Sequence, residues 1–574
     1  MGSNRMRNVS ELAAIAVADH CSCAFGVVGN GNAHFVDALL RTKCQYVATR
    51  HEAGAIGAAD AYARVAGTLA VATTTYGAGF TNAITALAEA TFARSPLLLL
   101  VGAQPTTGPR PWDIKQDAIA THIGVSTITL GAGSIKSAID GAVEKARGEQ
   151  RPVIVEIPYD LATSPGREQA SSATTRSTVA KSSDKPKRVS QLSRSVRVPD
   201  EAEFFSALNS AVALMRSAVR PLVLGGRGAL LANAGRQLAE IAARLGAPTA
   251  TTALARSLFV GSPWDLGIAG GFSTVSSAEL IATADVVFVV GAGLNQFTTR
   301  FDTLFAQDAR VIQINTEARP TASCVTDVLC GDASVVCEAV LAQLPGATAS
   351  GWRDSVMRGD GSEARRSDAG EEFASDGRLD PRYLLRYLNE ILPSDCILVQ
   401  DIGHSIGWAP MYLDLPAGAP TVLMGTAYQS IGLAMLGAIG ANQATESTVV
   451  VGMGDGSALM SLADLDTLVR VASSCVVIVY NDKAYGAEIH QYASQGLEPG
   501  PMQIEEVDFA AVTRGLGGDG EVIRSVADLD HLTRWVSSGA KGLFLLDCRV
   551  SATIVAPFMT EIAAHVRAHD EGRI

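Results

Sequence analysis

Short, continuous apolar runs alternate with alanine-rich helical segments along most of the chain. Clear examples of these runs are Val153–Ile157, Val286–Val290, Val311–Ile314, Val449–Val451 and Val476–Tyr480. A run that is apolar at nearly every position suits a strand buried on both faces, as in a parallel sheet covered by helices on both sides. The pattern therefore predicts an α/β protein built from doubly wound parallel sheets.

Two polar stretches divide the sequence into three blocks. Residues 166–198 are rich in Ser, Thr, Lys and Arg, residues 348–378 are rich in charged side chains, and both lack apolar periodicity. Such composition is typical of exposed linkers. The remaining blocks, 1–165, 199–347 and 379–574, each contain their own apolar runs and helical segments. We therefore expect three doubly wound parallel-sheet domains joined by two linkers.

The composition excludes several classes of protein. Hydrophobic residues make up 47% of the chain and charged residues 18%, which is enough apolar material for several cores. The net charge of −12 argues against nucleic-acid binding through phosphate neutralisation. No apolar run approaches the ~18 residues of a membrane span. The N-terminus lacks the pattern of a secretory signal. Nine scattered cysteines without a C-x-x-C pair argue against a disulfide framework or a zinc site. We expect a cytoplasmic protein with no nucleic-acid or membrane partner.

The third block places polar residues directly after two of its predicted strands. Gly454-Asp455-Gly456 follows one strand, and Asn481 follows the next after 24 intervening residues. Ligands of open α/β sheets bind at the carboxyl ends of the strands. The two glycines allow close approach by a phosphate, while Asp455 and Asn481 supply the oxygen ligands that Mg²⁺ prefers. The spacing predicts a site for magnesium and a phosphate group.

This spacing resembles the diphosphate-binding motif of thiamine diphosphate (ThDP) enzymes. The resemblance implies that Asp455, Asn481 and the backbone carbonyl of Lys483 bind Mg²⁺. It also implies a set of side chains and glycines that contact the cofactor: Gly403, Ile431, Gly454, Asp455, Gly456, Ser457 and Tyr485. Among them, Ile431 takes the place of a large apolar side chain that, in the family, wedges between the two rings of ThDP and bends it. A core isoleucine is the alternative interpretation.

The first block supplies a matching signal in Arg50-His51-Glu52, which precedes a helical segment rich in Ala and Gly. It resembles the pyrimidine-binding domain of the acetolactate synthase and pyruvate decarboxylase superfamily. There the glutamate hydrogen-bonds the aminopyrimidine ring and is needed for activation of the cofactor, so Glu52 is a predicted catalytic residue. Taken alone, Glu52 would be a carboxylate at a helix start.

Further matches extend the resemblance over almost the whole chain. Thr75–Gly79 and Gly102–Pro105 follow the order of the pyrimidine domain, and Pro221–Gly228 resembles the central domain. That domain binds FAD or ADP in some members. Here the segment Gly291–Phe297 departs from the run typical of anabolic acetolactate synthases, which makes FAD doubtful.

The motifs that set the reaction form a mosaic. The position of Glu488 after Asn481 matches a glutamate of pyruvate and indolepyruvate decarboxylases, but Asn30 stands where those enzymes have an aspartate, and their His-His pair is missing. Gln116 resembles a glutamine of acetolactate synthases. His404 follows a strand end and is a candidate proton relay, with a structural histidine as the equal alternative. We therefore predict catalytic roles for Glu52, Glu488, His404 and Gln116.

These motifs predict a ThDP- and Mg²⁺-dependent enzyme that decarboxylates a small 2-oxo acid and then performs carboligation or protonates the product to an aldehyde. In the family the two cofactor-binding domains come from different subunits, which implies a homodimer or homotetramer with active sites between subunits. The alternatives are an acyl transferase of the same superfamily, a FAD- or NAD-linked oxidoreductase, and a ThDP-binding paralogue without turnover.

Overall fold

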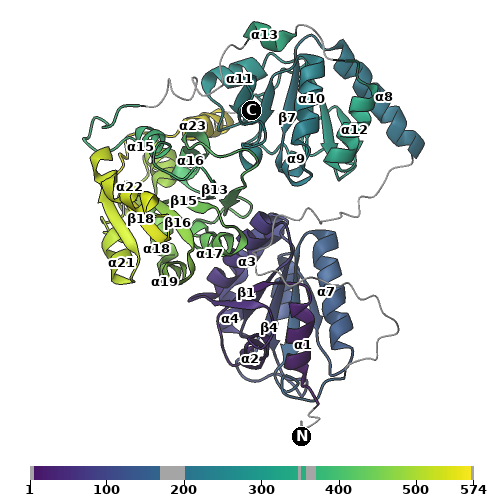
Figure 1. The fold of residues 1–574 in the computed structure, drawn as a ribbon, viewed down its shortest axis with the longest axis vertical. Helices are drawn as coiled ribbons and strands as arrows, with labels where there is room; N and C mark the ends of the chain where they lie inside the picture. Colours follow the sequence, from purple (N-terminus) through teal and green to yellow (C-terminus); the bar gives the residue numbers. More distant parts are fainter. Residues whose placement is uncertain (1–5, 168–200, 347–350, 357–369, 571–574) are drawn as a thin grey trace.

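The computed structural model describes residues 6–167, 201–346, 351–356 and 370–570. Three six-stranded sheets, parallel throughout, form three domains, each with helices on both faces of its sheet (Figure 1). The α/β fold with three doubly wound parallel sheets is therefore confirmed. The predicted linker 166–198 lies almost entirely outside the described residues, whereas the predicted linker 348–378 is described at 351–356 and at 370–378 and includes the short helix α13 (Trp352–Val356). In the described ranges no helix combines the length and apolar character needed to cross a membrane.

The first domain has the strand order β2-β1-β3-β4-β6-β5. Its elements are, in chain order, α1 (Val9–Ala18), β1 (Cys23–Gly26), α2 (Ala33–Leu39), β2 (Gln45–Ala48), α3 (Glu52–Ala66), β3 (Ala70–Thr74), α4 (Ala78–Asn82), α5 (Ile84–Phe92), β4 (Leu97–Ala103), α6 (Gln116–His122), β5 (Ser126–Thr129), α7 (Ile135–Glu149) and β6 (Pro152–Pro158). The central strand β4 is buried at every position, as expected for a strand covered on both faces.

The second domain has the strand order β12-β11-β10-β7-β8-β9. Its elements are α8 (Glu201–Ser217), β7 (Pro221–Gly225), α9 (Arg227–Leu231), α10 (Gly235–Leu245), β8 (Thr249–Thr251), η1 (Ala253–Ala255), β9 (Asp265–Ile268), α11 (Val275–Ile281), β10 (Val286–Val290), β11 (Arg310–Asn315), β12 (Asp327–Cys330), α12 (Ala333–Gln343) and α13 (Trp352–Val356). The glycine-rich turn after β7 packs against the turn after β10. A Cβ on Gly228 in the first of these turns would lie 2.8 Å from Gly291 Cα in the second. This close backbone contact gives Gly228 a structural role.

The third domain has the strand order β14-β13-β15-β16-β18-β17. Its elements are α15 (Pro381–Leu388), β13 (Cys396–Asp401), η2 (His404–Gly407), α16 (Trp408–Tyr412), β14 (Thr421–Met424), α17 (Ala434–Ala444), β15 (Thr448–Gly454), α18 (Asp455–Met460), α19 (Leu462–Val471), β16 (Ser474–Tyr480), α20 (Gly486–Tyr492), η3 (Ala493–Gln495), η4 (Gly500–Met502), α21 (Phe509–Gly515), β17 (Asp519–Ile523), η5 (Val526–Leu529), α22 (Asp530–Ser537), β18 (Gly542–Cys548) and α23 (Pro557–Asp570).

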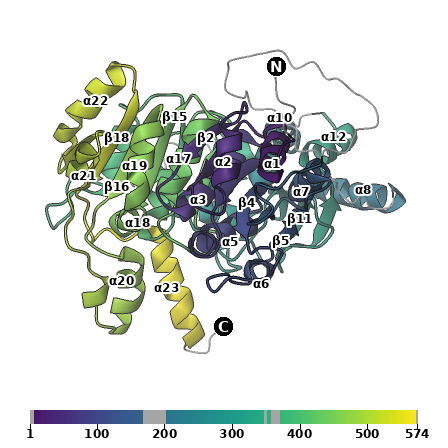
Figure 2. The same cartoon turned by 90° about the horizontal axis from the view of Figure 1, so that it is seen from below.

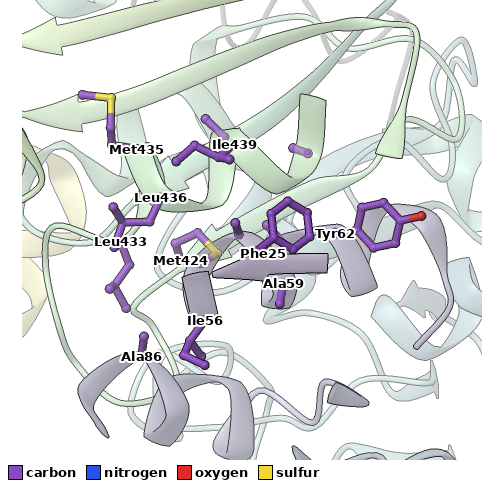
Figure 3. Close-up of a cluster of buried hydrophobic side chains, with 14 of the residues drawn as sticks. Phe25, Ile56, Ala59, Tyr62, Ala86, Met424, Leu433, Met435, Leu436 and Ile439 are labelled. Carbon is purple, nitrogen blue, oxygen red and sulfur yellow. The ribbon is translucent and has the colours of Figure 1, made fainter. Parts of the chain in front are cut away.

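The first and third domains share one hydrophobic core, because α3 lies against α17 (Figure 1). Ile56 and Tyr62 of α3 belong to the same buried cluster as Met424 and Leu433 of the third domain (Figure 3). Small residues let the two helices approach closely: a Cβ on Gly440 would lie 1.7 Å from the carbonyl oxygen of Ala58. The first residue of α3 is Glu52, so this contact fixes the position of a predicted catalytic residue.

The C-terminal helix α23 joins the third domain to the second. It lies beside α20 (Figure 2). Phe558 packs edge-on against Phe272 and Phe297 of the second domain, with ring centroids 5.5 and 5.8 Å away. Arg300 of the second domain forms an ion pair with Glu561. The chain just before α23 is thereby held against the predicted site of the third domain.

Candidate active site

The residues predicted to bind phosphate and metal lie where the strand order of the third sheet reverses. From the neighbouring strands β13 and β15, the strand order runs to β14 on one side and to β16, β18 and β17 on the other. In open α/β sheets, this switch point opens a crevice at the carboxyl ends of the strands. Gly454 of β15 pairs with Tyr480 of β16, so Asp455 and Asn481 leave the sheet side by side.

A pocket opens at this switch point. Within the described residues its lining comes from the third domain alone: Pro381, Ile402, Gly403, His404, Ser405, Trp408, Ile431, Gly454, Asp455, Gly456, Ser457, Tyr480, Asp482, Ala484, Tyr485, Gly486, Ala487, Glu488, Val550 and Ser551. The structure therefore brings together all seven predicted cofactor-binding residues, and also Glu488 and His404. Of the predicted metal ligands, Asp455 lines the pocket, whereas Asn481 and Lys483 do not. The predicted residues of the first domain, Glu52 and Gln116, are not part of this lining.

Asp455 is a buried carboxylate held by two backbone donors. Its Oδ1 accepts a hydrogen bond of 2.8 Å from the Gly456 N–H, and its Oδ2 accepts one of 2.8 Å from the Lys483 N–H. Burial, assisted by the negative charge of Asp482, raises the pKa of Asp455 to about 7. A divalent cation beside Asp455 would stabilise the ionised form.

Asn481 offers a buried acceptor oxygen to the same place. Its Nδ2 donates to the carbonyl of Val507 at 3.1 Å and to Asp547 Oδ1 at 2.9 Å, which fixes the orientation of the amide. Its Oδ1 is buried and has no hydrogen-bond partner among the described residues. Such an unpaired oxygen is costly unless a ligand completes it. Lys483 adopts a left-handed conformation (φ 66°), and its carbonyl already accepts the Ile504 N–H at 2.8 Å.

These residues fit a magnesium ion that shares oxygens with a bound diphosphate. A buried carboxylate, an unpaired amide oxygen and a backbone carbonyl are all hard oxygen ligands. Among the described residues, no group of three or more His, Cys, Asp and Glu side chains could hold a metal. This absence does not conflict with the proposed set, which has a single acidic member. Gly454 adds room, since a Cβ there would have only Ser405 Oγ nearby, at 3.8 Å.

Ile431 and Gly403 are neighbours in the pocket lining. A Cβ on Gly403 would lie 3.8 Å from Ile431 Cγ2, and the φ of 106° at Gly403 favours glycine. Ile431 is half-buried, so part of its side chain is open to the pocket. This placement favours the predicted wedge over a plain core isoleucine, whose side chain would be enclosed.

His404 is buried, and one of its ring nitrogens is engaged. Its Nε2 accepts a hydrogen bond of 3.0 Å from the Ala556 N–H, which leaves the proton on Nδ1, 3.6 Å from Asp482 Oδ2. The ring of His490 lies 4.5 Å from the ring of His404. Burial and the neighbouring His404 lower the pKa of His490 to about 4. A proton relay through His404 would therefore run on its Nδ1 side, toward Asp482.

Glu488 and Tyr485 lie at the start of α20, on the wall of the pocket. Glu488 is exposed in the single chain. Tyr485 packs over the glycine motif, because a Cβ on Gly456 would lie 2.5 Å from Tyr485 Cε1. An exposed carboxylate at the pocket wall can exchange protons with a bound substrate.

Glu52 lies at the carboxyl edge of the first sheet, just after β2. It is half-buried, and its Oε2 accepts a hydrogen bond of 3.0 Å from Asn82 Nδ2. A Cβ on Gly79 would lie 3.1 Å from its Oε1, so Gly79 leaves space beside the carboxylate. Oε1 is the atom left to contact a ligand on this edge.

Gln116 is buried, and its side-chain amide forms hydrogen bonds with two backbone groups and one carboxylate. Its Oε1 accepts the Gly77 N–H at 2.8 Å, and its Nε2 donates to the carbonyl of Gly102 at 3.1 Å and to Glu156 Oε1 at 3.3 Å. These three bonds favour a positioning role for Gln116, in place of the predicted catalytic one.

Sequence reasoning did not single out two aspartates, one that lines the pocket and one that is buried and holds the backbone next to Ile431. Asp482 lines it and lies near His404. Asp401, at the end of β13, accepts hydrogen bonds from the N–H groups of Gly432 (3.2 Å) and Ala434 (2.8 Å), on either side of Leu433. Burial raises the pKa of Asp401 to about 7. Both residues follow or end a predicted strand, which was the available signal.

The fold and the pocket define a class of protein: a three-domain α/β protein with a polar pocket at a sheet switch point, whose residues fit a diphosphate and a divalent cation. Comparison with known families makes the class specific. The N-terminal TPP binding domain, the central domain and the C-terminal TPP binding domain of thiamine pyrophosphate enzymes match residues 7–122, 208–340 and 401–548. The chain belongs to this family of ThDP-dependent enzymes.

Similar proteins carry out different reactions. A sulfoacetaldehyde acetyltransferase of Rhodobacter capsulatus is 26% identical over 93% of this chain and 92% of its own length. A probable 2-ketoarginine decarboxylase of Pseudomonas aeruginosa is 28% identical over 92% of this chain and 90% of its own length. The fold is similar to that of a ThDP-dependent 4-hydroxybenzoylformate decarboxylase of Rhodococcus jostii RHA1, with a TM-score of 0.75 and 19% identity. The superposition covers 95% of this chain and 99% of the decarboxylase chain.

Proposed function

We propose that the protein is a ThDP- and Mg²⁺-dependent enzyme that cleaves the bond next to the carbonyl of a small 2-oxo acid, with loss of CO₂. The product is then either protonated to an aldehyde or joined to a second carbonyl compound. The observation that carries the proposal is the buried, unpaired Oδ1 of Asn481, which leaves the sheet beside Asp455. Bound ThDP supplies the nucleophilic carbon that makes such a cleavage possible.

The residues of the chain divide the remaining work. Asp455, Asn481 and the carbonyl of Lys483 would hold the metal ion. Ile431, beside Gly403 in the pocket lining, would fix the shape of the bound cofactor. Glu488, exposed at the pocket wall, exchanges a proton with the substrate or product. Glu52 holds a proton at the aminopyrimidine ring.

We further propose that the site is completed by a second copy of the chain. The pocket lining comes from the third domain, whereas Glu52 lies half-buried at the edge of the first sheet. A homodimer, or a homotetramer built from dimers, would place Glu52 of one copy over the pocket of the other. Bound in that contact, the Glu52 carboxyl would be desolvated, which helps it to keep its proton.

An acyl transferase is the second candidate. It is favoured by the similarity to sulfoacetaldehyde acetyltransferase over nearly the full length of both chains. In that case the substrate is an aldehyde with an anionic leaving group, such as sulfite, on the neighbouring carbon. Departure of that group with its bonding electrons leaves an acyl group, which phosphate takes without any oxidant. Nine cysteines without a disulfide between them suit a reducing compartment, so we place the enzyme in the cytoplasm.

Calorimetry followed by a product screen tests the proposal. Titration with ThDP should give saturable heat in Mg²⁺ buffer and little in EDTA. A panel of 2-oxo acids, each with and without acceptor aldehydes, and sulfoacetaldehyde with phosphate are then read by mass spectrometry. An aldehyde, a hydroxyketone or an acyl phosphate identifies the branch. Absence of Mg²⁺-dependent ThDP binding would refute the cofactor assignment, and ThDP binding without CO₂ release would indicate either a paralogue without turnover or a reaction without decarboxylation.

A further inference from the structure

A buried ionic cluster lies between the first domain and the third. Arg64 of α3 contacts Asp60 of the same helix through Nε (2.8 Å) and Nη2 (2.5 Å), and it contacts Glu89 of α5 through Nη2 (3.2 Å). The side chains of Arg64, Asp60 and Glu89 are 7%, 1% and 0% exposed. Burying three charges is expensive, and an ion pair seldom repays the cost in stability. The cluster therefore calls for another explanation.

The remaining polar atoms of this cluster reach the loop that carries Ile431. Glu89 Oε2 accepts a hydrogen bond of 2.8 Å from the N–H of Tyr428. Arg64 Nη1 donates one of 2.9 Å to the carbonyl of Leu423, the third residue of β14. Both bonds are assisted by a charge and both are to backbone atoms, so they fix the course of the loop whatever its side chains. Phe92 adds a stacking contact on the Tyr428 ring, with centroids 5.9 Å apart.

The far end of the loop is fixed from the other side. Asp401 accepts the N–H groups of Gly432 and Ala434. Between Tyr428 and Gly432 the backbone turns sharply: Gln429 has a φ of 60° and Gly432 a φ of 85°. A non-glycine residue at positive φ persists only where its surroundings hold it there. Ile431 therefore lies on a short, strained segment that is held at one end by Glu89 of the first domain and at the other by Asp401 of the third.

We propose that Glu89 and Arg64 are positioning residues, which hold the 423–432 loop so that Ile431 projects into the pocket at the depth the cofactor needs. The inference rests on the proposed role of Ile431. It implies that the first domain acts twice, offering Glu52 to one pocket and setting the wall of another. A displacement of about 1 Å at such a wall is enough to reduce turnover by about 100-fold.

The first test uses Glu89→Gln, which keeps the shape of the side chain. A glutamine cannot accept both the Tyr428 N–H and the Arg64 guanidinium at its two ends, since one end is an NH₂ donor. Hydrogen exchange of residues 423–432, measured without cofactor, should speed up by at least about tenfold. Unchanged exchange would overturn the proposal that Glu89 holds the 423–432 loop, whether or not the protein uses ThDP.

The second test asks whether Glu89 acts through Ile431. We expect Glu89→Gln to lower kcat about 10- to 100-fold with little change in KM, and to alter the near-ultraviolet circular dichroism of bound ThDP. Ile431→Ala should have a similar effect. The double variant should be no worse than Ile431→Ala alone, because residues that act through one another are not additive. Independent, multiplied losses would overturn the inference, whereas failure of the wild type to bind ThDP would refute the proposed function instead.

Two further variants control the tests. Tyr62→Phe removes the hydrogen bond between Tyr62 and Ser22 (2.9 Å) on the same helix as Arg64, and should leave loop exchange and kcat unchanged. Phe92→Ala removes the stacking on Tyr428 at a side chain that is 54% exposed, so it should fold even if Glu89→Gln does not. It should speed exchange of the loop and lower kcat in the same direction. A response to Tyr62→Phe equal to that of Phe92→Ala would contradict the positioning role.

Discussion

Replacement of Gly440 by alanine tests the packing that fixes Glu52 relative to the third domain. The new Cβ would lie 1.7 Å from the carbonyl oxygen of Ala58 and 2.6 Å from its carbonyl carbon. Both are backbone atoms within a helix, so no side-chain rotation can relieve the clash. Because contacts shorter than about 3.0 Å are not tolerated, α3 and α17 must separate by about 1.3 Å.

That movement has a thermodynamic cost and a functional one. Overpacking in a core costs about 1–3 kcal/mol, and here the strain falls on two helices that share one core. Because α3 begins at Glu52, a shift of the helix also displaces the carboxyl group. We expect Gly440→Ala to lower the denaturation midpoint and to reduce turnover by about 100-fold, the usual effect of a displacement of this size.

Gly141→Ala is the matched control. Gly141 lies within α7, and no described atom lies within 4 Å of the position its Cβ would take. Alanine should therefore stabilise this helix by about 0.5–1 kcal/mol and leave turnover unchanged. Urea denaturation followed by far-ultraviolet circular dichroism, together with ThDP-dependent turnover, measures both variants. If Gly440→Ala is as stable and as active as Gly141→Ala, the helices do not pack as described.

Two other predictions concern the third domain. Asn481→Leu removes the unpaired oxygen and should weaken Mg²⁺-dependent ThDP binding at least about tenfold by calorimetry. It also removes the donor to Asp547 Oδ1, at a cost of about 1–3 kcal/mol of stability. Unaltered binding would exclude Asn481 as a metal ligand. The pKa of His490 is lowered from its ordinary 6.5 to about 4. As the pH falls, the unfolded chain therefore takes up a proton on His490 before the folded protein does. The contribution of His490 to stability is present above pH 6.5 and is lost progressively toward pH 4. His490→Gln should flatten that part of the profile of denaturation midpoint against pH, and an unchanged profile would contradict the burial of this ring.

The strands and the cofactor motif could be predicted from the sequence because each depends on local signals. Val286–Val290 coincides with β10, and Val476–Tyr480 lies within β16. Strands of this kind are apolar on both faces, which few other elements are. The same regularity placed Asp455 and Asn481 at strand ends, and the register of β15 and β16 brings them together.

The roles of individual side chains depend on contacts that sequence spacing does not encode. Gln116 resembled a catalytic glutamine, but its amide is engaged by Gly77, Gly102 and Glu156. His404 follows a strand end as predicted, yet its Nε2 is engaged by Ala556, which is far away in the sequence. Which polar atoms remain free is decided by such tertiary contacts.

The contact between the first and third domains was also beyond sequence reasoning. The Arg64–Glu89 cluster lies in two alanine-rich helices that are buried at most of their positions. Its proposed role depends on the hydrogen bond from the N–H of Tyr428, in a different domain, to Glu89. Charged residues are rarely buried unless they are paired, so full burial was not expected there.

Mixing two inactive variants tests most directly whether Glu52 and Asp455 act on one cofactor from different subunits. Glu52→Gln and Asp455→Asn proteins are unfolded together, refolded, and assayed against each protein refolded alone. If the site is shared, each mixed dimer contains one pocket with both wild-type residues, and random pairing should restore about a quarter of wild-type turnover. If the two residues serve the same pocket from within one chain, every pocket in the mixture remains defective, and turnover stays at the level of the separate variants.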